Sequence, residues 1–208
     1  MDRISHRMFG WFGILGAVTS LVTVLTLDAL VGGEPLRGST LRRLTISEYV
    51  YSAGRWAFVV AVLALAIGSV LLLYGLILSG AVRAISVGSL LMSLWVAGLA
   101  AIVAFPKHNW AIGASGSGTV HRVATLVAFV ALPAAVLVIA RGRARAARWL
   151  AIGAVGWLSV LFGAIGVGIA TDRSWWRLIP LGLVERGIAG FEVLAVIALG
   201  VWLARQQG

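Results

Sequence analysis

The sequence predicts an all-α protein: a bundle of six transmembrane helices that forms a single domain over residues 1–208. Hydrophobic residues make up 61% of the chain and charged residues 12%, a balance far from that of soluble domains. The charged residues are separated by long apolar runs, and about 20 mainly apolar residues suffice for a helix to cross the hydrocarbon core. Six such runs lie along the chain.

The six predicted spans follow from the gaps between charged residues. They cover 9–32, 56–82, 84–105, 123–140, 149–171 and 183–204. Asp28 interrupts the first span and Glu192 the sixth, and we expect the short fourth span to begin before Arg122. The first run is longer than the apolar region of a signal peptide and no small-residue cleavage site follows it, so we expect it to be a retained helix. Glycines in the first and fifth spans are expected to serve close helix packing.

An even number of spans places both ends of the chain on one side of the membrane. With the ends inside, Lys and Arg number eight in the inner segments and nine in the outer ones, so the count does not decide the orientation. The segment RGRARAAR at 141–148 concentrates four arginines in one short loop, which opposes translocation. Sixteen arginines against one lysine suggest a GC-rich bacterial genome. We therefore predict a multi-pass protein of the bacterial inner membrane with cytoplasmic termini.

The net charge of +10 does not indicate a nucleic-acid partner, because the arginines are scattered between apolar runs. The chain has no cysteine, which excludes disulfides, thiolate nucleophiles and Cys-ligated zinc. All acidic residues except Asp2 gather in the outer half under the predicted orientation. They are Asp28, Glu34, Glu48, Asp172, Glu185 and Glu192. We expect the chemistry of the protein at that end, where the connecting loops are also longer.

The stretch LVERGIAGFEVLAV at 183–196 carries the deepest charge. Glu185 and Glu192 are seven residues apart, so they share one helix face and Glu192 lies about 10 Å deeper. A carboxylate near the bilayer centre costs about 2.5–3.5 kcal/mol, so it should face the bundle interior and be protonated or paired. Glu192 is therefore a candidate proton donor. The alternative is a packing role, in which it hydrogen-bonds a neighbouring helix.

Further titratable residues precede or follow other spans: Glu48 in LTISEY, His108 in FPKHNW and His121 at the start of the fourth span. The candidate catalytic residues are Glu48, His121, Glu185 and Glu192, which would perform general acid/base work. His108 and His121 could hold Zn²⁺ with the carboxylates, but HExxH and close His-x-His spacings are missing, so we predict no metal. The sequence does not indicate whether the protein uses a cofactor.

A Ser/His/acid arrangement of Ser47, Glu48 and His121 is an alternative. It is disfavoured because the sequence contains no GxSxG, and Ser47 is expected to cap a helix that starts near Glu48.

Arginines and tryptophans near the outer span ends are candidate substrate-binding residues. Arg122 and Arg186 could hold a phosphate head group, although snorkelling beside lipid phosphates is the favoured explanation of any one of them. Nine tryptophans are present, and most lie near span ends, as in the interfacial aromatic belt. Those assigned to the site are Trp110, Trp175 and Trp176.

Several segments resemble a bacterial membrane family catalogued as domain of unknown function 998. They are LRRLTISEYVYSAGRWAF at 41–58, AFPKHNW at 104–110, GSGTVHRVATLVAFVALPAA at 116–135 and GLVERG at 182–187. Where the family usually follows Phe-Pro with Thr-Asp-Pro, this chain has Lys107-His108-Asn109. The resemblance covers essentially the whole chain and implies a six-helix membrane protein of unestablished activity, distantly akin to lipid-handling families with six spans.

The leading hypothesis is an intramembrane enzyme that modifies a lipid or an isoprenoid by acid/base chemistry at a site open to the outer leaflet. The reaction would be hydrolysis or transfer at a head group, or proton-initiated cyclisation in an aromatic-walled cavity. One alternative is a non-catalytic subunit or lipid-binding scaffold with a membrane protein partner. Another is a proton-coupled transporter, for which water must reach Glu192 from both sides.

Overall fold

The computed structural model describes residues 4–31, 45–109 and 113–206, and this part of the chain is helical without strands. It contains six long helices: α1 (Ile4–Leu30), α2 (Arg55–Leu78), α3 (Val87–Ala104), α4 (Gly116–Ile139), α5 (Arg145–Ala170) and α6 (Leu181–Ala204). Two short 3-10 helices accompany them: η1 (Ile46–Tyr51) and η2 (Trp175–Arg177). Six helices are long and apolar enough to cross a membrane, which confirms the predicted fold class.

Helix ends differ from the predicted spans because capping groups, not charges, determine them. The second span stops at Leu78 rather than 82, and Gly80 follows with a φ of +71°. The fourth begins at Gly116, before Arg122 as expected, because the Ser115 side chain accepts a hydrogen bond from the Gly118 N–H. The charged residues at the ends of the apolar runs therefore predict where each span lies, but not the residue at which its helix begins or ends.

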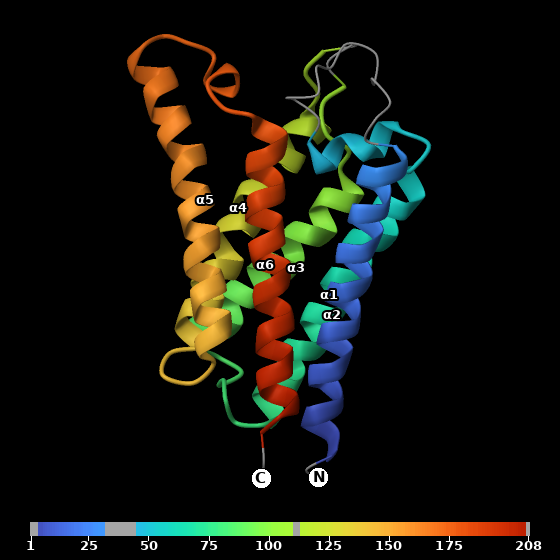
Figure 1. Cartoon of the computed structure of the whole chain (residues 1–208), viewed down its shortest axis with the longest axis vertical. Helices are drawn as coiled ribbons and strands as arrows, with labels where there is room; N and C mark the ends of the chain where they lie inside the picture. Colours follow the sequence, from blue (N-terminus) through green and yellow to red (C-terminus); the bar gives the residue numbers. More distant parts are fainter. Residues whose placement is uncertain (1–3, 32–44, 110–112, 207–208) are drawn as a thin grey trace.

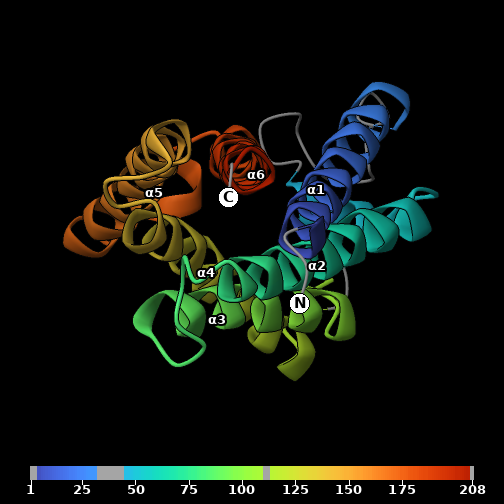
Figure 2. The same ribbon diagram turned by 90° about the horizontal axis from the view of Figure 1, so that it is seen from below.

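The ends of the chain lie at the same end of the bundle, as six spans require (Figure 1). We call the opposite end the outer end, in keeping with the predicted orientation. Helix α6 lies between α1 and α5, and α2 runs beside α1 while α3 packs on α4 (Figure 2). The outer end carries η1, η2 and the connection from α3 to α4.

Glycines of the first span serve close packing, as predicted. A Cβ atom on Gly10 would lie 2.8 Å from the Gly200 carbonyl oxygen, and one on Gly16 would lie 2.4 Å from the Ala64 carbonyl oxygen. The prediction is only partly right for the fifth span. Gly153 and Gly168 meet neighbours there, but no described atom lies within 4 Å of a Cβ built on any of three others: Gly156, Gly163 and Gly166.

The apolar interior is continuous in the inner and middle parts of the bundle and divided in the outer half. The main cluster takes residues from all six helices, for instance Ala17, Leu72, Met92, Leu132, Ala147 and Leu199. Toward the outer end there are two smaller clusters. The first outer cluster is Leu27, Tyr49 and Phe58 on α1, η1 and α2. The second outer cluster is Leu158, Leu161, Val184 and Ile188 on α5 and α6.

Candidate functional site

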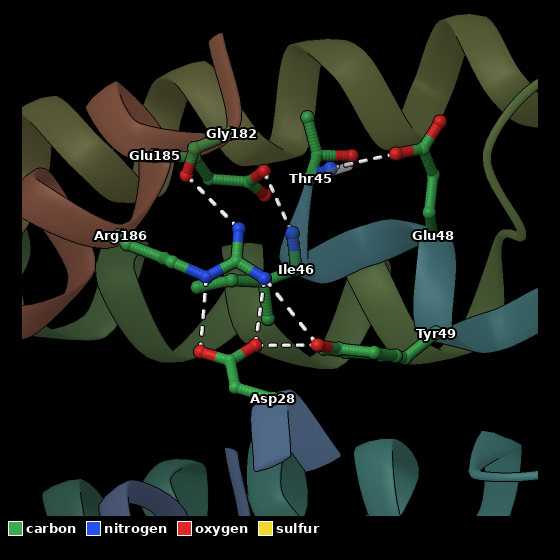
Figure 3. A network of polar contacts seen from close by, with 8 residues as sticks. All are labelled: Asp28, Thr45, Ile46, Glu48, Tyr49, Gly182, Glu185 and Arg186. Carbon is green, nitrogen blue, oxygen red and sulfur yellow. Dashed lines mark hydrogen bonds and ion pairs between the residues drawn. The ribbon is translucent and has the colours of Figure 1, made fainter. Parts of the chain in front are cut away.

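An ion pair at the outer end joins α1 to α6 (Figure 3). The Arg186 guanidinium donates to both carboxylate oxygens of Asp28, from Nε at 3.0 Å and from Nη2 at 2.6 Å. Nη2 also donates to the Tyr49 hydroxyl oxygen at 3.3 Å, and the Tyr49 hydroxyl donates to Asp28. Nη1 donates to the Gly182 carbonyl oxygen at 3.0 Å. The bidentate geometry makes this a strong, oriented contact.

Two of the predicted catalytic carboxylates bind backbone N–H groups at the start of η1. Glu185 accepts from the Ile46 N–H at 2.9 Å, and Glu48 accepts from the Thr45 N–H at 2.6 Å (Figure 3). These contacts satisfy donors that the beginning of a helix leaves free. The expected cap was Ser47, but Thr45 occupies the N-cap position of η1 and the Ser47 hydroxyl hydrogen-bonds the Thr45 hydroxyl at 3.1 Å.

Lys107 ties the connection after α3 to η1. Its Nζ donates to the Thr45 hydroxyl at 2.9 Å and lies 3.8 Å from a Glu48 carboxylate oxygen. The Tyr51 hydroxyl donates to the Lys107 carbonyl oxygen. A cation from the connection after α3 therefore holds Glu48 at the start of the η1 segment.

The environment of Tyr49 favours the neutral phenol. Burial, together with the hydrogen bond to the Asp28 carboxylate, raises the pKa of Tyr49 to about 12. Burial also raises the pKa of Tyr51. Both hydroxyls are thus hydrogen-bond donors at neutral pH, and they hold η1 against the ends of α1 and α3.

The two candidate histidines are buried and occupy different positions. The Ser115 N–H donates to His108 Nδ1 at 2.9 Å, and the His108 ring covers Gly118 so closely that a Cβ there would lie 2.3 Å away. His121 Nδ1 shares a 2.8 Å hydrogen bond with the Phe105 carbonyl oxygen, whereas its Nε2 has no partner among the described atoms. The described part of the chain brings together no three His, Asp or Glu residues that could hold a metal.

Glu192 lies in the middle of α6, between Leu181 and Ala204. Its exposed fraction is 1%, and within residues 4–31, 45–109 and 113–206 neither carboxyl oxygen meets a hydrogen-bond partner. It shares a helix face with Ile188 of the second outer cluster and Val196 of the main cluster. The acid therefore points into the bundle, as expected, at the level where the apolar interior divides.

The remaining candidate substrate-binding residues are dispersed. Arg122 is exposed on α4. Trp175 packs against the second outer cluster, and its ring meets the edge of Trp176, which is 45% exposed, at 5.9 Å between centroids. Trp110 falls outside the described residues.

Sequence reasoning missed the partners of Arg186. The sequence identifies Asp28 as an interruption of the first span and as one of the acids of the outer half, but assigns it no partner, and Tyr49 is not among its candidates. The sequence does hold one indication of this contact. Asp28 and Arg186 are oppositely charged residues at predicted span ends that share the outer side, and a charge within a span is expected to find a partner.

The family described as "Protein of unknown function (DUF998)" matches residues 14–202. The chain belongs to this family. Its match spans all six helices, from within α1 to within α6, in agreement with the resemblance found in the sequence. No curated protein and no solved structure matches the chain.

Proposed function

We propose that this DUF998 protein is an intramembrane enzyme that performs acid/base chemistry on a lipid or an isoprenoid, with Glu192 as the proton donor. One observation carries the proposal: the buried carboxyl of Glu192 at the middle of a transmembrane helix, with both oxygens unpaired among the described atoms. Leaving a polar group buried without a hydrogen bond costs about 1–3 kcal/mol. Such a cost is typical of a group reserved for a ligand or a reaction.

His121 is the second proton-handling residue in this proposal. Its exposed fraction is 5%, and in the described structure Nε2 remains available. The hydrogen bond of Nδ1 to the Phe105 carbonyl oxygen orients the ring and makes Nε2 the acceptor in the neutral form. In this proposal Glu48 and Glu185, predicted as catalytic from sequence, position η1 by accepting hydrogen bonds from the backbone N–H groups of Thr45 and Ile46 at its start.

The test is conversion of lipid by the purified protein. Wild-type protein and Glu192→Gln are incubated with a membrane lipid extract, and lipid species are followed by mass spectrometry. Wild-type protein should consume at least one species and E192Q should not, because an amide cannot donate a proton as an acid does. Ser159→Ala, on the exposed surface of α5, is the matched control and should keep the wild-type rate. Equal conversion by E192Q would contradict the proposal.

A non-catalytic scaffold is the second candidate, and a specific observation favours it. Asp28, Glu48 and Glu185 are all satisfied by an arginine, a lysine or backbone N–H groups, as in a structural network. This function predicts that wild-type protein converts no lipid, that a defined membrane subunit co-purifies with it, and that Glu192→Gln leaves this association intact.

A further inference from the structure

Helices α1 and α6 meet at the inner end and separate toward the outer end (Figures 1 and 2). At the inner end Gly10 and Gly200 bring the two backbones together, and Arg7 Nε donates to the Ala204 carbonyl oxygen at 2.9 Å. At the outer end the connection runs through the long side chain of Arg186. Close glycine packing thus joins α1 and α6 at the inner end, whereas the guanidinium of Arg186 bridges the wider gap between them at the outer end.

The boundary between α1 and α6 in the outer half is polar, whereas the boundaries on either side of it are apolar. Helix α1 packs with α2 and η1 through the first outer cluster, and α6 packs with α5 through the second. The two clusters share no residue within the described ranges. Across the boundary between them, Arg186 contacts Asp28 and Tyr49, and Glu185 accepts from the Ile46 N–H (Figure 3).

Glu192 lies deeper in the bundle than these contacts. It shares the helix face of Glu185 and stands two turns deeper, about 10 Å along the axis. Its exposed fraction of 1% means that no ligand reaches it in the structure as it stands. Apolar clusters hold the helices together on both sides, so the α1–α6 boundary is the place where exchange of polar partners can open a path from the lipid.

The closing contact is suited to exchange. The side chains of Arg186 and Asp28 are 29% and 28% exposed, so they are partly accessible from outside the bundle. A phosphate group and a carboxylate bind a guanidinium in the same bidentate manner. A phosphate-bearing molecule at this level of the membrane can therefore replace Asp28 on Arg186 without leaving the cation unpaired.

We propose that the α1–α6 boundary at the outer end is a lateral entrance for a lipid with an anionic phosphate head group. The head group takes the place of Asp28 on Arg186, and the apolar chain passes between the two outer clusters toward Glu192. This inference rests on the proposed function for the role of Glu192 and adds to it the class of substrate and its route. Asp28 is then the competitor that closes the entrance when no lipid is bound.

The opening is tested by distances between spin labels, since the chain contains no cysteine of its own. One label pair is placed at Leu30 and Leu183, which are 76% and 57% exposed at the outer ends of α1 and α6. A second pair at Met8 and Arg205 reports the inner end. Asp28→Asn and Arg186→Gln should both lengthen and broaden the outer distance and leave the inner distance unchanged. An unchanged outer distance in both variants would overturn the proposal.

Binding separates the two variants, because both break the ion pair but only one keeps the cation. With phosphatidic acid as the probe, D28N should bind about tenfold more tightly and R186Q about tenfold more weakly than wild type, the effect of one charge-assisted contact. Diacylglycerol, which has the same chains without phosphate, should bind D28N and R186Q equally, because it does not contact the cation that distinguishes them. Equal binding of phosphatidic acid by both variants contradicts the proposal. Inorganic phosphate that binds as tightly as phosphatidic acid would identify a free anion as the ligand and also contradict it.

These measurements need no turnover, so they fail independently of the proposed function. If the entrance opens and binds phosphatidic acid but the protein converts no lipid, this inference holds and the proposed enzymatic function is refuted. Conversion that depends on Glu192 but not on Arg186 or Asp28 would do the reverse.

Discussion

Glu185 and Glu192 lie on the same face of α6, yet their carboxyl groups have different surroundings. Glu185 accepts a hydrogen bond from the Ile46 N–H at 2.9 Å, while Glu192 is buried where the described chain offers its carboxyl no partner. The first carboxylate anchors η1 to the bundle. The second adds a desolvation cost to folding that no hydrogen bond within the described residues offsets, and the proposed role of Glu192 rests on this difference.

Replacing Glu192 by leucine should stabilise the protein. The substitution removes an unsatisfied buried polar group between two apolar clusters, and the gain should be about 1–2 kcal/mol in the free energy of unfolding. Thermal unfolding in detergent, followed by circular dichroism, measures the effect. Glu185→Leu is the matched control on the same face and should destabilise, because it leaves the Ile46 N–H without its acceptor. A less stable E192L would show that Glu192 has a structural role.

The Asp28–Arg186 ion pair should contribute to stability in a way that a double-mutant cycle detects. D28N and R186Q should each lower the free energy of unfolding by about 1 kcal/mol, a modest value because both side chains are partly exposed. The double variant should lose less than the sum of the two, since both changes remove the same contact. Strictly additive losses would show that the two residues act separately.

Tyr49 should contribute to the stability of the folded protein at neutral pH, and this contribution should be lost at high pH. Its pKa of about 12 in the folded protein lies above the ordinary value of 10.0, so the folded state holds the phenol proton more tightly than the unfolded chain does. This contribution is complete below pH 10 and is lost as the pH rises toward 12. Chemical unfolding at a series of alkaline pH values should show this loss for wild type. Tyr49→Phe should lack that part of the pH dependence, and an identical profile would refute the assignment.

Glycine packing between α1 and α2 predicts a large effect at one position and none at another. Gly16→Ala places a Cβ 2.4 Å from the Ala64 carbonyl oxygen, so the helices must move apart at a cost of about 1–3 kcal/mol. Gly156→Ala introduces the same group on α5, where the described atoms leave open space, and should be neutral or slightly stabilising. Unfolding measurements on the two variants compare them directly. Equal stabilities would mean that α1 and α2 do not pack as described.

Much of the fold was predictable because the bilayer imposes it. A chain with so few charges has to place its apolar runs in lipid, and the length of each run then dictates a helix. The same logic placed Glu192 in the bundle interior, since lipid does not solvate a carboxyl group. It also brought Glu48, His121 and Glu185 to one end, because successive spans alternate in direction.

The pairing of the polar groups was not predictable in this way. Composition and spacing state how deep a side chain lies, but not which of several neighbours at that depth it meets. Arg186 was expected to bind an anion from outside the chain. In the folded protein its guanidinium binds the carboxylate of Asp28, which lies 158 residues earlier. Glu48 and Glu185 were expected to handle protons, and the folded chain shows that they accept hydrogen bonds from the backbone N–H groups of Thr45 and Ile46. Those contacts depend on the angles between helices, which arise from packing at Gly10, Gly16 and Gly200. Hydrophobicity determines only the depth of a residue in the membrane, whereas a hydrogen bond requires that two groups have the right positions in all three dimensions.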